Sequence, residues 1–308
     1  MFWIKLKKAG RVTFQICWLG TVALFVIGLM FAGPASVNAG PLQSGIDAFQ
    51  HQDYATAIQD FGQAIQEEDE VETAYSDRCL TYLLISIPEQ AVEDCSAALK
   101  LNPDRPQVRF YRGLAQYRLG HYEQAIADFT QHLQDHAQDA RAYYNRGLAA
   151  FADGRVAQAI ADYNRAVTHS STLTPVLTPV EMSDLYNDLG VAYFASTQLE
   201  SAIAVLDQAI VLDESDPRAY FNRGCVCHHQ GNDMAALKDF EQALALDPSH
   251  AETYLHRGMV RQHLGDHPGA IADLEQALDH FQHQGNTQGV HQAKIRLRQL
   301  ASPQQAIG

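Results

Sequence analysis

Basic residues are scarce in this chain. Its 308 residues include 22 Lys and Arg against 36 Asp and Glu. Four of the basic residues lie before residue 12, so the sequence beyond residue 39 carries 18 basic and 36 acidic groups, formally −18. Contacts with phosphate groups require a positive surface. The composition therefore argues against a protein that binds nucleic acid or anionic lipid through phosphates.

The sequence also lacks the usual signatures of enzymes. No Ser-His-Asp set, Gly-rich phosphate loop or inward-facing carboxylate pair is found outside the repeated pattern described below. The acidic stretch 67–70, with Glu72, lacks the glycine-centred loop of known calcium sites, and a solvated turn is the better interpretation. We therefore expect a protein that has no catalytic activity and binds no cofactor.

Charged residues are absent from Val12 to Ile46. The preceding Lys5, Lys7, Lys8 and Arg11 form a positive end, and residues 16–32 are an apolar run of 17. A bilayer-spanning helix needs ~20 residues and the apolar region of a signal peptide ~7–15. Residues 1–39 are thus either a membrane anchor, slightly favoured, or a signal peptide cleaved before Gly40. Both interpretations keep the positive end in the cytoplasm and place the remaining chain outside it, in a periplasm or lumen.

A 34-residue repeat organises most of the remaining sequence. Arg223-Gly224 has counterparts at intervals of 34 residues, except for one interval of 43 between Gly147 and Gly190. Twelve residues after each Gly, or after Cys79 in its place, stands an alanine in all seven repeats. A frame with its eighth position at this Gly gives repeats 38–71, 72–105, 106–139, 140–173, 183–216, 217–250 and 251–284. Internal repetition of this length predicts a solenoid.

Each repeat contains two apolar-periodic stretches separated by Gly or a polar turn, which predicts helix–turn–helix units. Small residues recur at frame positions 8, 20 and 27 because antiparallel helices approach to roughly 8–10 Å only over small side chains. Pro103 and Pro248 close their repeats at position 32. The sequence "AYFNRGCVCHHQGNDMAALKDFEQALALDP" shows the whole pattern.

In spacing and residue types the pattern resembles the tetratricopeptide repeat (TPR) family, over about residues 42–301. The resemblance implies an all-α fold, a right-handed α-solenoid of about seven repeats. Residues 42–173 would form repeats 1–4, residues 174–182 an inserted loop, and residues 183–284 repeats 5–7. Residues 285–308 would form a capping helix and tail, with the helix over residues 287–301. Departures from the family pattern include Cys79 at the Gly position, His132 at a packing alanine and Thr197 at the turn Gly.

An Arg–Asp pattern is specific to this chain. Frame position 7 is Arg and position 23 is Asp in the same five repeats, and repeat 5 loses both together, with Leu189 and Val205. Repeat 1 has Asp60 against Ser44. This joint gain and loss predicts a structural ion pair between the two helices of a repeat. The predicted pairs are Arg78 with Asp94, Arg112 with Asp128, Arg146 with Asp162, Arg223 with Asp239, and Arg257 with Asp273.

The first helix of repeats 2–5 carries a second apolar stripe, at positions 5, 9 and 12, in addition to the stripe that faces its own second helix. Part of it must pack between repeats, and the rest would line a concave groove of the TPR type. The predicted groove residues are Leu80, Leu83, Phe110, Leu114, Tyr117, Tyr144, Leu148, Phe151, Val191, Phe194 and Phe221. Positions 5 and 9 hold no basic residue that would clamp a terminal carboxylate. We therefore expect a scaffold that binds apolar segments of a protein or peptide partner, with the N-terminal segment contacting the membrane.

Cysteines and histidines cluster in repeat 6. Cys225 and His229 share one helix face, and His263 lies one repeat further on, so a copper or zinc site is geometrically permitted. Cys227 points away and is expected to be buried. The favoured interpretation is a polar end of the groove without metal, and an extracytoplasmic metal-handling protein is the alternative function. Cys79 and Cys95 face one helix seam, where two buried thiols are favoured over a disulfide.

Overall fold

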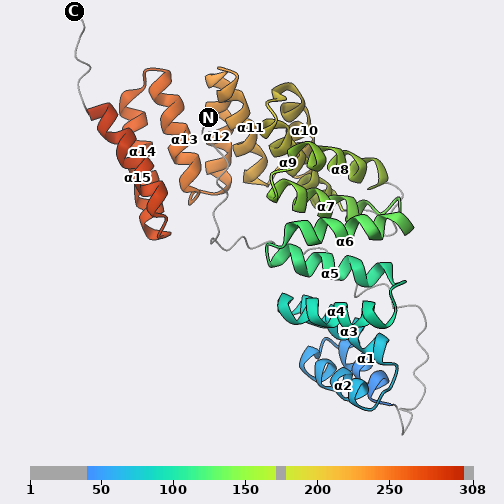
Figure 1. Cartoon of the computed structure of the whole chain (residues 1–308). Helices are drawn as coiled ribbons and strands as arrows, with labels where there is room; N and C mark the ends of the chain where they lie inside the picture. Colours follow the sequence, from blue (N-terminus) through green and yellow to red (C-terminus); the bar gives the residue numbers. More distant parts are fainter. Residues whose placement is uncertain (1–39, 171–177, 302–308) are drawn as a thin grey trace, which may run out of the picture. The chain divides into compact units, whose positions relative to one another are not determined.

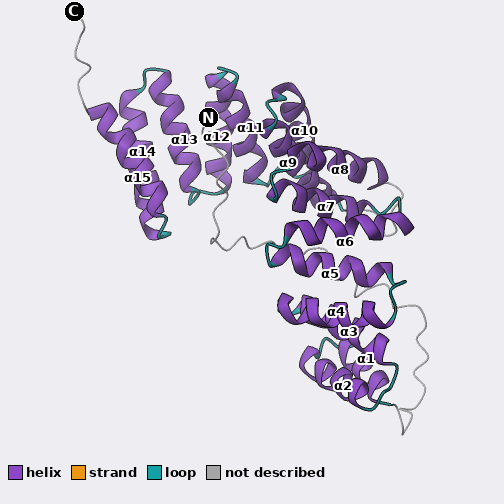
Figure 2. Ribbon diagram, viewed as in Figure 1, coloured by secondary structure: helices purple, strands orange, loops and turns teal. Residues whose placement is uncertain are grey.

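The computed structural model describes residues 40–170 and 178–301, which form fifteen α-helices and no strand (Figure 1, Figure 2). The predicted all-α fold is confirmed. The predicted signal peptide or anchor at residues 1–39 lies outside the described residues. Within the described residues, no helix combines the length and apolar character needed to cross a bilayer.

The chain divides into two compact units, Met1–Thr174 and Pro175–Gly308. The first contains four helical hairpins, in which the first helix of a repeat (A helix) packs against the second (B helix). Consecutive hairpins pack on one another in chain order. These helices are α1 (Pro41–Gln50), α2 (Tyr54–Gln66), α3 (Val71–Leu84), α4 (Pro88–Leu101), α5 (Pro106–Arg118), α6 (Tyr122–Asp135), α7 (Ala140–Ala152) and α8 (Val156–His169).

The second unit contains three hairpins and one further helix. Its helices are α9 (Pro179–Ala195), α10 (Leu199–Leu212), α11 (Pro217–His229), α12 (Asp233–Leu246), α13 (Ala251–His263), α14 (His267–His283) and α15 (Thr287–Ala301). Helix α15 packs on α14, where its Ala293 is fully buried. Apolar side chains of both helices form one cluster there. The helix expected over residues 287–301 is therefore present and covers the last hairpin.

The prediction of a loop over residues 174–182 is wrong for its second half. Residues 171–177 lie outside the described residues, but α9 begins at Pro179. Thr178 caps the helix, since its hydroxyl accepts a hydrogen bond from the backbone N–H of Glu181, whose carboxylate in turn accepts one from the backbone N–H of Thr178. This reciprocal cap and a proline at the first helical position both favour a helix start at Pro179.

The turn between the A and B helices requires a left-handed backbone at frame position 15. Four repeats have glycine there, for example Gly120 with φ +77° and Gly231 with φ +80°. Gln52, Ser86 and Thr197 adopt the same conformation at φ +62°, +62° and +63°. The turn geometry is thus kept even where the residue type disfavours it.

The seam between the A and B helices explains the glycine at position 8. A Cβ built on Gly147 would lie 2.6 Å from the ring of Tyr163, and one on Gly113 would lie 2.8 Å from the ring of Phe129. Real carbon atoms do not approach so closely, so the ring at position 24 requires the absence of a side chain opposite. Both rings are buried at the centre of their hairpins. The glycine at position 8 and the aromatic ring at position 24 are therefore complementary in packing, and each depends on the other.

Candidate functional site

The A helices are fixed on the B helices by the Arg–Asp pairs predicted from the sequence. In repeat 4, Arg146 Nε donates to Asp162 Oδ2 at 2.8 Å and Nη2 donates to Oδ1 at 2.6 Å. The same two-bond contact joins the partners in repeats 2, 3, 6 and 7. In repeat 1, the Ser44 hydroxyl donates to Asp60 at 2.6 Å. The predicted pairing is confirmed.

Arg112, Arg146 and Arg223 also connect successive repeats. A further amino group of Arg146 donates to Thr130 Oγ1 at 3.0 Å, and that of Arg223 lies 2.6 Å from Asp207 Oδ1. Both acceptors stand at position 25 of the preceding B helix. The guanidinium of Arg146 additionally lies over the ring of Tyr143, 5.5 Å from its centroid. Each of these three guanidinium groups is therefore held by an aspartate of its own repeat and by a side chain of the preceding one.

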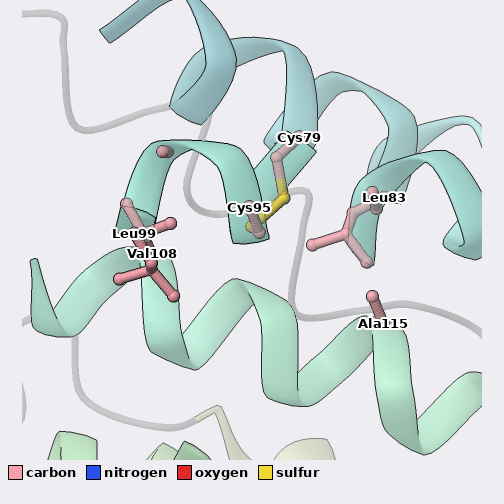
Figure 3. Packing of buried hydrophobic residues seen from close by; sticks show 8 residues of the cluster. Cys79, Leu83, Cys95, Leu99, Val108 and Ala115 are labelled. Carbon is pink, nitrogen blue, oxygen red and sulfur yellow. A yellow bond between two sulfur atoms is a disulfide. The ribbon is translucent and has the colours of Figure 1, made fainter. Parts of the chain in front are cut away.

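Cys79 and Cys95 form a disulfide between α3 and α4, with both residues fully buried (Figure 3). The favoured prediction of two free thiols is wrong. The two cysteines occupy frame positions 8 and 24, where other repeats pair glycine with a ring. Leu83, Leu99 and Val108 pack around the bridge. The sulfur bridge thus takes the place of the ring as the centre of repeat 2.

Two of the predicted groove residues are core residues. Leu83 is fully buried, and Phe110 is 6% exposed. The Phe110 ring packs on Phe129 of its own B helix at 5.6 Å between centroids, and Tyr144 and Phe221 make the equivalent contacts with Tyr163 and Phe240. Position 5 is therefore directed to the hairpin seam. The assignment of Leu83 and Phe110 to an accessible groove is corrected accordingly.

The remaining predicted residues at positions 9 and 12 are half-buried. Position 9 holds an apolar, half-buried side chain in all seven repeats: Ile46, Leu80, Leu114, Leu148, Val191, Cys225 and Met259. Position 12 adds the half-buried aromatic residues Tyr117, Phe151 and Phe194. Within the first unit, α3 contacts α5 and α5 contacts α7, so residues at one frame position lie on neighbouring helices. Leu114 and Phe194 also pack against the hairpin cores, as expected for part of this stripe.

A different set of ligand-type side chains converges in the second unit. Over residues 40–170 and 178–301, the one cluster of three His, Cys, Asp or Glu that could hold a metal ion is His228, Asp233 and His263. The predicted set of Cys225, His229 and His263 does not assemble, and only His263 belongs to both. Cys225 is half-buried, and desolvation raises the pKa of its thiol. Cys227 is buried, as expected.

Asp233 was not among the predicted ligands because the prediction considered only cysteine and histidine side chains. A signal was nevertheless present, since position 17 is apolar or aromatic in repeats 1–5 and changes to Asp233 in repeat 6. His228 Nδ1 lies 2.6 Å from Asp233 Oδ1, and His263 Nδ1 lies 2.5 Å from Asp233 Oδ2. One carboxylate therefore joins histidines from two successive A helices.

His132 fills the position of a packing alanine without leaving its ring unpaired. The ring is fully buried, and its Nδ1 lies 2.8 Å from the Pro106 carbonyl oxygen. Its Nε2 lies 3.0 Å from Asp139 Oδ2. The carboxyl of Asp139 is itself buried, which opposes ionisation, but the hydrogen bond from His132 and the Arg141 charge outweigh this and lower its pKa. His132 therefore links the first residue of α5 to Asp139, the N-cap of α7.

Similarity to known proteins is concentrated in the repeats. A family model described as tetratricopeptide repeat matches residues 86–139, 112–173 and 234–286, and a second of the same description matches 217–250. A third, described as TPR repeat, matches 190–231. Together they cover residues 86–173 and 190–286, more than half of the chain.

Solved structures show the same resemblance. A tetratricopeptide repeat protein from Parabacteroides merdae aligns over 85% of this chain and 98% of its own, with TM-score 0.59 and 16% identity. YrrB, a TPR protein described as having an unusual peptide-binding site, aligns over 67% of this chain and all of its own, with TM-score 0.52 and 22% identity. At these identities the structures establish the fold alone.

The probable serine/threonine-protein kinase BSK3 of Oryza sativa subsp. japonica is 34% identical over 79 residues, a quarter of this chain. The match spans 16% of that protein's length.

Proposed function

We propose that this chain, which belongs to the tetratricopeptide repeat family, is a protein-interaction scaffold that binds apolar segments of partner proteins. The observation that carries the proposal is the apolar, half-buried residue at position 9 of every repeat. Apolar side chains presented side by side on neighbouring helices are suited to docking an apolar helix or extended segment. Catalytic activity is not part of the proposal.

The chemistry of this surface restricts the partner. Neither position 5 nor position 9 has a basic residue in any repeat, so a terminal carboxylate would find no charged clamp there. Aromatic residues at position 12, such as Tyr117 and Phe151, supply rigid apolar contact area of the kind that dominates binding energies. We therefore propose recognition through aromatic anchors.

We also propose that the repeats lie outside the cytoplasm, attached to the membrane or exported. The positive, then apolar, N-terminal sequence supports this location. The disulfide between Cys79 and Cys95 supports it as well, because disulfides persist mainly in oxidising compartments.

Affinity capture from detergent-solubilised membranes tests the proposed surface. The test variant carries Leu148→Ser and Phe151→Ser, which change one half-buried face of α7 without touching the buried seam. The control carries Leu101→Ser and Val211→Ser, two exposed apolar residues on B helices. A captured partner is identified by mass spectrometry, purified and titrated against each protein.

We expect the test variant to lose affinity by at least tenfold and the control to bind as the wild type does, with the helical circular dichroism signal of all three unchanged. Equal affinity of the test variant and the wild type would refute the proposed surface.

A further inference from the structure

We infer that His228, Asp233 and His263 form a binding site for a late first-row transition-metal dication, with zinc as the representative ion. The three side chains come from α11, α12 and α13, and their ligand atoms lie within 4.8 Å of one another. The inference goes beyond the proposed scaffold function and does not depend on it: His228 stands at position 12, but the site is formed by polar side chains, whereas the proposed docking uses the apolar ones.

The carboxylate of Asp233 is the centre of the cluster. Its side chain is 9% exposed, and each of its oxygens faces a different imidazole, at 2.6 Å for His228 and 2.5 Å for His263. His228 is 26% exposed and His263 is 67% exposed. The site therefore has a buried carboxylate at its inner end and a solvent-exposed histidine at its outer end, so that an ion can enter from the surface.

Comparison among the repeats shows that the fold does not need these polar groups. Positions 12 and 17 pack as an aromatic pair in repeat 1, where the Phe49 and Tyr54 centroids are 5.9 Å apart, and in repeat 3, where those of Tyr117 and Tyr122 are 5.8 Å apart. Repeat 6 replaces both members at once, with His228 and Asp233. An apolar contact that stabilises other repeats has been exchanged for two metal-ligating side chains.

The third ligand, His263, contacts the preceding repeat in a way that is also seen elsewhere in the chain. Position 13 of one repeat reaches back to position 12 of the preceding one, as shown by Arg118, which donates to the Leu83 carbonyl oxygen at 2.5 Å. His263 stands at position 13 of repeat 7 and reaches His228, with ring centroids 6.2 Å apart. The register of the solenoid therefore places its imidazole beside the His228–Asp233 pair.

Two imidazoles and one carboxylate are a ligand set that suits zinc, copper and nickel, and three protein ligands leave one tetrahedral position open for water or a further ligand. Metal–ligand bonds of ~2.0 Å would place the ligand atoms about 3.3 Å apart. Both imidazoles, at 2.6 and 2.5 Å from the carboxylate oxygens, must therefore move back from Asp233 when an ion binds. On binding, each imidazole Nδ1 gives up any proton it donates to Asp233 and supplies its lone pair to the metal.

The nearest arginine on α13 is already paired with a carboxylate, so its charge does not oppose a bound cation directly. Arg261, on the same helix as His263, forms an ion pair with Asp273 at 3.0 Å. A bound ion would link repeats 6 and 7 through three helices. The structure thus assigns to it a cross-linking role within the second unit.

Titration of the purified, metal-stripped full chain with Zn²⁺ in a calorimeter tests the inference. We expect one ion per chain at micromolar affinity or tighter. His228→Ala, Asp233→Asn and His263→Ala should each weaken binding by at least about tenfold, as losses around metal sites commonly do. His229→Ala is the matched control, because it removes an exposed imidazole adjacent to the site in sequence, and Cys225→Ser controls for the thiol.

Cobalt gives a second readout. Co²⁺ bound to nitrogen and oxygen ligands should show visible d–d bands without the near-ultraviolet charge-transfer band of a cobalt–thiolate bond. Absence of binding tighter than about 100 μM would overturn the inference. So would unchanged affinity in His228→Ala and His263→Ala, or loss of affinity in His229→Ala alone.

Discussion

Arg146 and Asp162 form a two-bond ion pair between α7 and α8 in which both partners are largely removed from water. The exposed fractions of the side chains are 11% and 2%. Because the carboxylate is buried, removal of the arginine leaves a charge without its partner, whereas removal of both leaves none. Loss of one partner should therefore lower the stability of the protein more than loss of both partners.

The first prediction follows from this asymmetry. Asp162→Ala should lower the free energy of unfolding by ~2–4 kcal/mol, because it leaves the Arg146 guanidinium half-enclosed and unpaired. Arg146→Leu with Asp162→Val, the pair that repeat 5 has naturally at Leu189 and Val205, should recover most of the loss. Urea denaturation followed by circular dichroism measures both variants. The pairing has no such role if the double variant unfolds no later than the single one.

The second prediction concerns the bridge in repeat 2. Replacing Cys79 and Cys95 by alanine should cost about 3 kcal/mol, the value expected for a disulfide that closes a loop of about this length. Cys79→Gly with Cys95→Phe reinstates the glycine–ring packing of repeats 3 and 6 and should restore much of the stability. Thermal melting with and without dithiothreitol distinguishes the variants, since only the wild type should respond to the reductant. A wild type that melts alike in both conditions would contradict the bridge.

The third prediction uses the turn between α9 and α10. Thr197 adopts φ +63°, a conformation that is costly for a β-branched residue. Thr197→Gly should therefore raise the free energy of unfolding by about 0.5–1 kcal/mol, the loss of backbone strain exceeding the added freedom of the unfolded chain. The reverse change at the equivalent turn, Gly231→Thr, should be destabilising. Equilibrium denaturation in urea checks the opposite signs.

The fourth prediction concerns Asp77 on α3. Burial raises the pKa of its carboxyl to about 6, against the opposing charge of Arg105. Between pH 4 and 6 the folded protein holds a proton that the unfolded chain has released, so this residue makes unfolding easier as the pH rises through that window. Asp77→Asn should stabilise the protein by about 2 kcal/mol at pH 8 and very little at pH 4. Asp104→Asn, at an exposed position, serves as the control, and a pH-independent gain would exclude the proton linkage.

The fifth prediction tests the proposed location. An alkaline phosphatase fusion after Ser302 should be active in bacteria, because the basic residues before Val12 hold the N-terminus in the cytoplasm and the following apolar segment directs the remainder across. The same junction fused to a reporter that works only in the cytoplasm should be inactive. The reverse pair of activities would place the repeats in the cytoplasm.

The sequence by itself determined the solenoid, its register and its internal ion pairs. Positions 7 and 23 change together within one chain, so the contact of Arg146 with Asp162 was predictable without coordinates. The same holds for the cap at residues 287–301. The helix pattern and the ion pairs recur in successive repeats, so an interpretation of one repeat applies to the others.

The tertiary structure decided which apolar side chains remain accessible and which polar ones meet. Phe110 and Leu83 share the helical stripe of Tyr117, yet they are covered by neighbouring helices, because burial depends on what packs against a face as well as on the face itself. Asp233 meets His263 from 30 residues away only through the stacking of α13 on α12. A repeat pattern fixes positions along one helix, whereas contacts between helices depend on how the side chains fill the space between them.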